Sequence, residues 1–230
     1  MTVSTQQDLH DVVTRRHSCR AFLPESLPGD LIMSILNTAQ QAPSWCNTQP
    51  WQLIVTSGSS TDDFRRALLA HADSEPHISD PDFPKPAVYT EERLTRRRAC
   101  GWALYESVGV ERGDRAGSAL QARENYAFFG APHVAIITTH TELGVYGAVD
   151  CGLHLATFLY AAEAHGVGAI AQAALANHAP FIRDYFQIPA EQLILFGVSF
   201  GWPDQDHPAN AFRTTRAELE QVVRWVGDPA

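Results

Sequence analysis

The feature that most constrains this 230-residue chain is a run of residues, Val145 to His165, that is apolar on nearly every side. A helix of this kind is normally buried in a core or in an interface. Its most apolar part, residues 148–164, contains Asp150, His154 and Glu163 and is too short to cross a bilayer. We therefore expect a buried or interfacial helix here and no membrane partner.

The rest of the chain alternates between helical and strand patterns around this run. The simplest interpretation is a single α+β domain spanning residues 1–230, because no repeat, low-complexity stretch or linker interrupts the pattern. Apolar periodicity predicts helices over residues 6–16, 28–41, from 60 onward, 90–108, 114–129 and 181–186, and β-branched runs predict strands over 51–56, 133–139, 167–171 and 193–200.

Two segments break the regular pattern. Residues 75–88 contain four prolines and are expected to form an irregular surface loop, which is typical of a lid over a binding site. The C-terminal segment has an expected helical turn at 217–220, then the apolar residues Val222, Val223, Trp225 and Val226, so we expect it to pack against something.

Charge and cysteine content exclude several classes of protein. The formal net charge of −9 disfavours nucleic acid as a partner, since a general nucleic-acid binder needs a basic face. The four cysteines show no C-x-x-C spacing, and the histidines show no metal-ligand spacing, so we expect no metal site. The N-terminus has no basic and apolar leader, and we therefore expect a cytoplasmic protein.

The segment that follows the first expected helix concentrates cations and a hydroxyl. Arg15 and Arg16 end that helix, and Ser18 and Arg20 follow closely. Guanidinium forks and a hydroxyl are suited to a phosphate monoester, whereas the end of a helix alone does not attract an anion. A phosphate site and simple capping of the helix C-terminus by the arginines are both compatible with this pattern.

Two further segments carry polar groups that suit a ligand. Residues 42–51, Ala-Pro-Ser-Trp-Cys-Asn-Thr-Gln-Pro-Trp, combine side-chain amides with indoles, which can bind the edge and the face of a heterocycle. An ordinary Asn/Pro turn would explain them equally well. Residues 210–216 again place arginines beside hydroxyls, which is also the pattern of a solvated helix start.

One motif indicates a different chemistry. Residues 197–201 fit the G-x-S-x-G pattern of a serine hydrolase, with Ser199 as the nucleophile. That motif requires a helix directly after the serine, and Pro203 disfavours one. His207 is the only later histidine and follows too closely to build a separate active-site loop, so a strand that ends in a glycine turn is favoured.

The three polar segments, in this order, resemble the FMN-dependent nitroreductase family, and most of all its nitrobenzoate-reductase-like subgroup. The family's opening motif R-x-S-x-R-x-F is matched by Arg16, Ser18, Arg20 and Phe22. Its motif A-P-S-x-x-N-x-Q-P-W is matched in full by residues 42–51. The ending Gly-Trp-Pro-Asp, followed by Asn210 and the last arginines, is also similar.

The resemblance implies a nitroreductase-like fold: a mixed, mostly antiparallel sheet flanked by helices, in an intertwined homodimer. FMN would lie at the interface, with residues 145–165 as an interface helix and the tail reaching the partner. The implied cofactor-binding residues are Arg16, His17, Ser18, Arg20, Pro43, Ser44, Asn47, Gln172, Ala173, Arg213 and Arg216, with Trp45 and Cys46 facing the substrate.

The implied activity is that of an FMN-dependent oxidoreductase. NADH or NADPH would reduce the flavin, and a small nitroaromatic, quinone-like or related acceptor would then take the electrons in a ping-pong hydride transfer. The flavin supplies the chemistry, so we assign no catalytic acid or base. The alternatives are reductive dehalogenation or other flavin chemistry on the same fold, a flavin-binding protein without turnover, and the serine hydrolase.

Overall fold

The central strand of the fold is β2 (His133–His140), which is buried on both faces. In this computed structural model, which describes residues 5–227, β2 lies between β1 (Gln52–Ser57) and β4 (Gln192–Gly201). Strand β3 (Gly168–Gln172) completes the sheet in the order β1-β2-β4-β3. All three pairings are antiparallel, and a single parallel bridge joins Ser18 to Ala169. The four predicted strands and the α+β class are confirmed.

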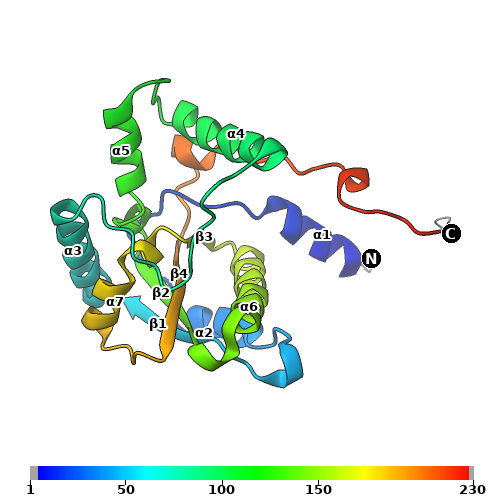
Figure 1. Cartoon of the computed structure of the whole chain (residues 1–230), viewed down its shortest axis with the longest axis horizontal. Helices are drawn as coiled ribbons and strands as arrows, with labels where there is room; N and C mark the ends of the chain where they lie inside the picture. The colour runs from blue at the N-terminus through cyan, green and yellow to red at the C-terminus, as the bar shows by residue number, and fades with distance from the viewer. Residues whose placement is uncertain (1–4, 228–230) are drawn as a thin grey trace.

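Helices cover both faces of this sheet (Figure 1). Alternate side chains of β2 enter opposite cores, with Val134 and Ile136 on one side and Ala135 and Ile137 on the other, because side chains in a strand alternate between its faces. The first core includes residues of α3 and α7, and the second includes residues of α2 and α6. The helices are α1 (Thr5–Arg15), α2 (Gly29–Ala39), α3 (Ser59–Ser74), α4 (Glu91–Ser107), α5 (Arg115–Arg123), α6 (Gly144–Ala164) and α7 (Ala179–Phe186).

Helix α6 confirms the expectation drawn from the long apolar run. Cys151, Phe158 and Ala162 on one side are buried against the sheet, whereas Val149 and Leu153 on the other are exposed. The helix therefore has one apolar face in the core and a second one open. Within residues 5–227, no helix has the length and hydropathy needed to span a membrane.

The proline-rich loop between α3 and α4 has no helix or strand over residues 75–90, as predicted. Its Asp82 carboxylate accepts hydrogen bonds from the Arg183 guanidinium and from the Ile194 amide, each at 2.6 Å. The loop is thus tied to α7 and β4, and its role as a lid stays a prediction.

The predicted helix over 114–129 is too long, because α5 ends at Arg123. Phe128, Phe129 and Gly130 all have positive φ values, between 53° and 77°. This left-handed turn buries both phenylalanines and leads the chain into β2. Left-handed backbone is costly for residues with a Cβ, so an interaction outside the turn must support it.

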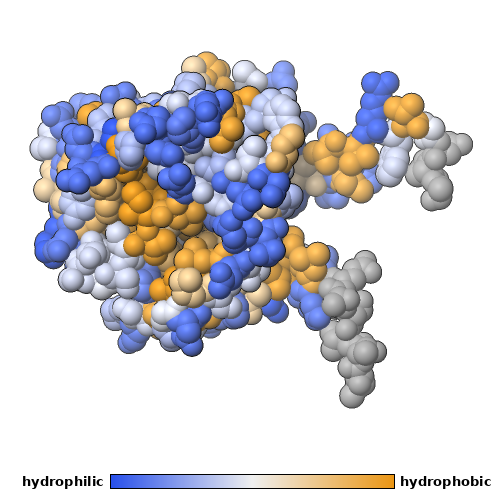
Figure 2. Space-filling model, turned by 90° about the horizontal axis from the view of Figure 1, so that it is seen from below, coloured by the Kyte–Doolittle hydropathy of each residue, from blue (hydrophilic) through white to orange (hydrophobic). Residues whose placement is uncertain are grey.

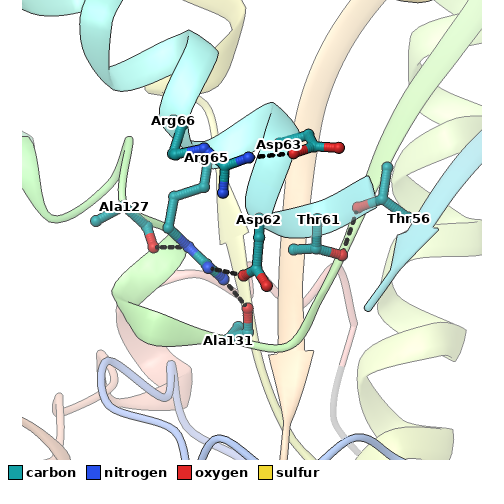
Figure 3. A network of polar contacts seen from close by, with 8 residues as sticks. All are labelled: Thr56, Thr61, Asp62, Asp63, Arg65, Arg66, Ala127 and Ala131. Atoms are coloured by element: carbon teal, nitrogen blue, oxygen red, sulfur yellow. Dashed lines mark hydrogen bonds and ion pairs between the residues drawn. The ribbon is translucent and has the colours of Figure 1, made fainter. Parts of the chain in front are cut away.

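Arg65 of α3 supplies that support (Figure 3). Its guanidinium donates to the carbonyl oxygens of Ala127, at 3.0 Å, and Ala131, at 2.5 Å, one on each side of the turn. It also lies over the Phe128 ring, 5.7 Å from the centroid, and forms an ion pair with Asp62. One side chain therefore joins α3 to the entrance of the central strand.

The C-terminal segment extends away from the body, on the same side as α1 (Figures 1 and 2). Its expected helical turn is a short 3-10 turn at Leu219–Gln221. Val222, Trp225 and Val226 are all more than 60% exposed. Within residues 5–227 these three side chains belong to neither core, and the packing of the tail stays a prediction.

Replacing Arg65 with alanine should destabilise the protein. The change removes two hydrogen bonds from a charged donor to turn carbonyls, and we expect the free energy of unfolding to fall by about 2–4 kcal/mol. Arg66→Ala is the matched control, because Arg66 is exposed and its ion pair is with Asp63 on its own helix. Urea unfolding of the three proteins is the measurement; equal losses in the two variants would contradict the role of Arg65.

The buried His154 should make stability depend on pH. Its ring lies 4.8 Å from that of Trp51, and burial lowers its pKa from 6.5 to about 4. The unfolded chain binds a proton at this site below pH 6.5 and the folded chain does not. Stability is therefore full above pH 6.5 and declines as the pH falls towards 4.

His154→Leu should remove this contribution. Between pH 7.5 and pH 5 the wild type should lose about 2 kcal/mol more unfolding free energy than the variant. Urea unfolding at both pH values measures this difference. Identical pH dependence in the two proteins would show that His154 is not held neutral by the fold.

Candidate functional site

The side chain of Asn210 joins two arginine-bearing segments that lie far apart in the sequence. Its Oδ1 accepts the backbone N–H of Arg20 at 2.6 Å, across 190 positions. Its Nδ2 donates to the carbonyl oxygens of Ala21, at 2.9 Å, and Asp204, at 2.8 Å. Because Asn210 is buried, these bonds fix residues 16–20 beside residues 210–216.

The first of these segments is also anchored to the sheet. After α1 ends at Arg15, Ser18 forms a bridge with Ala169, and the Cys19 amide donates to the Ala169 carbonyl at 3.1 Å. Burial raises the pKa of the Cys19 thiol to about 11, so Cys19 is a packing residue. The neighbouring residues Arg16, Ser18 and Arg20 line a cavity instead.

These segments enclose a cavity of about 540 Å³. It contains six of the residues predicted for the cofactor site, and none of its lining residues is acidic. Helix α4 contributes Cys100, and α6 contributes Tyr160. The lining residues are Val13, Thr14, Arg16, His17, Ser18, Arg20, Cys100, Tyr160, Phe212, Arg213, Thr214 and Arg216.

The four arginines of this cavity have no carboxylate partner among residues 5–227. Arg20 donates instead to the Ser18 carbonyl at 3.2 Å, Arg213 to the Asn210 carbonyl at 2.7 Å, and Arg216 to Thr214 Oγ1 at 2.9 Å. In a chain with a net charge of −9, such a cluster is a local exception. Its charge and geometry suit an anion with several oxygens, such as a phosphate.

The protonation of the cavity follows from burial and from these cations. Burial lowers the pKa of His17, the Arg213 and Arg16 guanidinium groups lower it further, and a hydrogen bond to the Arg15 carbonyl raises it. Burial also lowers the pKa of Arg20, which nevertheless stays charged at neutral pH, as arginines do. The positive charge of the cavity thus comes from the arginines.

The second predicted part of the site, residues 43–47, lies elsewhere in the same chain. Trp45–Asn47 form a 3-10 turn whose Trp45 amide donates to Asp150 of α6 at 3.1 Å. This contact is near the start of α6, whereas Tyr160, which lines the arginine cavity, is near its end. At 1.5 Å per residue the two positions are about 15 Å apart along the helix. A single chain does not bring these parts together.

The third predicted part, Gln172 and Ala173, lies at the end of β3. The Gln172 side chain is buried: its Oε1 accepts from Ser199 Oγ, and its Nε2 donates to the Asn125 carbonyl at 2.8 Å. The small side chains of Ala171 and Ala173 are exposed on either side. A ligand at this edge would therefore meet backbone groups and alanine methyls.

Ser199 does not have the surroundings of a hydrolase nucleophile. It is fully buried in the interior of β4, and the strand continues to Gly201 with no helix directly after the serine. This contradicts the serine-hydrolase alternative, since the nucleophile elbow exposes its serine at a strand-to-helix turn. In the part of the chain described, no three His, Cys, Asp or Glu side chains meet as metal ligands would.

Sequence reasoning missed several residues of the site. Asn210 belongs to a matched motif, but nothing in the motif reveals that its amide joins the two segments. In the sequence, Asp150 stands out only as a polar interruption of an apolar run. Cys100, Tyr160 and Phe212 carry no local signal, and only the tertiary structure places them in the cavity.

Comparison with known proteins shows the family of the chain. Residues 13–202 match the family described as Nitroreductase family. Nitroreductase NfnB of Mycolicibacterium smegmatis (strain ATCC 700084 / mc(2)155) is 32% identical over 228 residues, which cover 97% of this chain and 95% of that protein. The 4-nitrobenzoate reductase of Pseudomonas putida is 31% identical over 220 residues, 96% of each chain.

Solved structures show the same fold. The FMN-dependent nitroreductase NfnB from Mycobacterium smegmatis, crystallised in complex with NADPH, superposes with a TM-score of 0.91 at 30% identity, covering 96% of this chain and 99% of that one. The FMN- and NADPH-dependent NfnB from sphigopyxis sp. strain HMH gives a TM-score of 0.92 at 29% identity, with the same coverage. The chain therefore belongs to the nitroreductase family and has its fold.

Proposed function

We propose that this protein is an FMN-dependent oxidoreductase that uses NADH or NADPH to reduce nitroaromatic, quinone-like or related acceptors, with residues 1–230 acting as one domain. The observation that carries the proposal is the cavity lined by four arginines that no carboxylate within residues 5–227 neutralises. This anion site supports the proposal in addition to the family to which the chain belongs. The relatives named nitroreductase and 4-nitrobenzoate reductase support the reaction class.

The donor set of the cavity fits the phosphate of FMN. Arg16, Arg213 and Arg216 supply planar forks of N–H groups, and Ser18 supplies a hydroxyl. The end of α1 adjoins the cavity with the negative pole of its dipole, so the arginines must provide the attraction. His17, with its lowered pKa, can contribute a neutral hydrogen bond beside them.

Bound FMN would supply the redox chemistry by accepting a hydride from the nicotinamide cofactor and passing electrons to the acceptor. The chain's own residues bind and orient. Arg20 is largely buried between the cavity and the Ser18 carbonyl and can stabilise negative charge that develops nearby. The exposed Ala171 and Ala173 leave a smooth edge for a flat ring, while the internal bonds of Gln172 hold that edge in place.

A homodimer would complete the site. The exposed side of α6 contains Val149, Gly152 and Leu153, with the half-buried Ala156 one turn further on. Gly152 and Ala156 are small enough to allow close approach of a second helix. Antiparallel pairing of two α6 helices would bring the start of one beside the end of the other. Pro43, Ser44 and Asn47 of one subunit could then reach the arginine cavity of its partner, with Trp45 and Cys46 beside the acceptor.

The exposed ends of the chain support the same assembly. The tail carries Val222, Trp225 and Val226 away from the body, as Figure 1 shows for the segment as a whole, and a second copy offers the surface that the tail lacks here. All four cysteines are free thiols, which a reducing compartment would maintain. The cytoplasmic location stays a prediction.

Steady-state kinetics tests the proposed function. With FMN bound, 4-nitrobenzoate or a quinone should be reduced at the expense of NADH or NADPH, and double-reciprocal plots at several acceptor concentrations should be parallel, as for a ping-pong reaction. Comparing kcat/KM for NADH and for NADPH shows which reductant the protein prefers. If the protein binds FMN but consumes no NADH or NADPH with any acceptor tested, a flavin-binding protein without turnover is favoured. Halide release from halophenols would favour reductive dehalogenation.

Arg16→Ala tests the phosphate assignment. Losing one charge-assisted contact should weaken FMN binding by about 1.5–3 kcal/mol, which is roughly 10- to 150-fold in Kd. Quenching of flavin fluorescence on binding is a suitable measurement.

Arg15→Ala is the matched control for this variant. The neighbouring Arg15 is exposed, pairs with Glu163 and does not line the cavity, so its removal should leave the Kd for FMN nearly unchanged. Unchanged FMN affinity in Arg16→Ala would overturn the assignment.

A further inference from the structure

The segment between α2 and β1 has an unusually strained backbone. Cys46, Asn47 and Gln49 have φ values of 50°, 57° and 46°, in the left-handed region, and none of them is glycine. Asparagine tolerates this conformation, but cysteine and glutamine rarely adopt it. Three such residues within four positions persist only where their surroundings hold the backbone in place.

Most of the hydrogen bonds of this segment are internal. The backbone N–H of Gln49 donates to Ser44 Oγ at 2.9 Å. The Gln40 side chain donates to Gln49 Oε1 and accepts from the Trp51 indole N–H. These bonds close the loop upon itself and on its own flanks. They do not set its position relative to the rest of the molecule.

One contact ties the segment to another element. The Trp45 amide donates to Oδ2 of Asp150, at 3.1 Å, and in the described chain it is the only hydrogen bond from residues 43–50 to a residue outside 40–51. One turn earlier on α6, the Tyr146 ring meets the Trp45 indole edge to face, with 4.3 Å between centroids. Helix α6 therefore holds both the backbone and the side chain of Trp45.

Asp150 is costly to keep where it is. It is only 5% exposed, and no lysine, arginine or histidine within residues 5–227 forms an ion pair with it. A buried carboxylate without a cation is unfavourable unless a hydrogen bond uses its charge. The hydrogen bond from the Trp45 backbone N–H uses the charge of Asp150 in this way. If this position served packing alone, an apolar residue would be more favourable there.

The Trp45 and Tyr146 rings are each more than half exposed, so the pair that Asp150 and α6 fix in place faces outward. Together the two rings present an aromatic surface with a defined orientation. Flat aromatic molecules stack on such a surface, and their binding is sensitive to its position.

We propose that Asp150 is a positioning residue that fixes the 43–50 segment, so that Trp45 and Tyr146 form an aromatic wall for the electron acceptor. The role of the wall in binding an acceptor rests on the proposed function. The positioning role of Asp150 rests on the contacts described above. Asp150 itself touches neither acceptor nor cofactor in this account. It acts through the Trp45 amide.

Backbone amide exchange tests the positioning without any activity. In Asp150→Ala, peptides covering residues 43–50 should exchange at least about tenfold faster than in the wild type, because the tie to α6 is lost. Asp150→Asn keeps an oxygen acceptor of the same size and should restore slow exchange. Cys151→Ala is the control for lost packing on α6, since Cys151 is buried next to Asp150 and has no bond to the segment.

Kinetics of the FMN-loaded protein tests the aromatic wall. Asp150→Ala should raise KM for 4-nitrobenzoate about tenfold while the rate of flavin reduction by NAD(P)H changes less, and Asp150→Asn should recover most of the loss. Trp45→Ala should raise the same KM, and combining it with Asp150→Ala should add little, because both act through one wall. Should Asp150→Ala fail to fold, Asp150→Leu, which fills the space without an acceptor, takes its place.

The outcomes are distinguishable. Unchanged exchange over residues 43–50 in folded Asp150→Ala or Asp150→Leu, which lack the acceptor oxygen, would overturn the positioning role, even if the wild type reduces no acceptor at all. Faster exchange with an unchanged KM for 4-nitrobenzoate would overturn the aromatic wall. Faster exchange with a raised KM, both reversed in Asp150→Asn and absent in Cys151→Ala, is the result that the proposal requires.

Discussion

The hydrogen bonds of one buried side chain, Asn210, hold the candidate site together. Its amide accepts from the backbone of Arg20 and donates to Ala21 and Asp204, so the two ends of the domain meet at this point. An amide suits this task because it donates and accepts at once and carries no charge to compete with the arginines. Its three hydrogen bonds hold two cationic segments together against the repulsion of their arginines.

Helix α6 connects the sheet, the arginine cavity and the 43–50 segment. Its inner face packs under the sheet, its last turns reach the arginine cavity through Tyr160, and its first turns hold the 43–50 segment through Asp150. The two predicted halves of the site therefore lie at opposite ends of one helix. The proposed two-fold pairing along α6 would unite them, and it would also account for the apolar face that this helix leaves open.

Much of the fold could be predicted from the sequence because its signals are local. The β-branched run of β2 and the all-round apolar pattern of α6 each indicate their structure within a few residues. The end of α5 could not be predicted in this way. Phe128 and Phe129 read as a continued helix, and only their burial in the core, with Arg65 bonded on either side, makes the left-handed turn favourable.

The candidate site shows the same division. The arginines and Ser18 could be nominated from motifs, since guanidinium groups and a hydroxyl suit a phosphate whatever the surrounding fold. The direction of the Gln172 side chain could not, because its partners Ser199 and Asn125 come from distant parts of the chain. Asp150 was hidden for a similar reason: the residue that it holds, Trp45, is 105 positions away.

The central claim is that the arginine cavity holds the phosphate of FMN, and comparing FMN with riboflavin tests it most directly. The two ligands share the ring system and differ by the phosphate alone. The account predicts that the purified protein, stripped of ligand and titrated with each, binds FMN at about one per chain and riboflavin about a hundredfold more weakly. Equal affinity for the two would contradict it, because the arginine cluster would then have no part in binding the flavin.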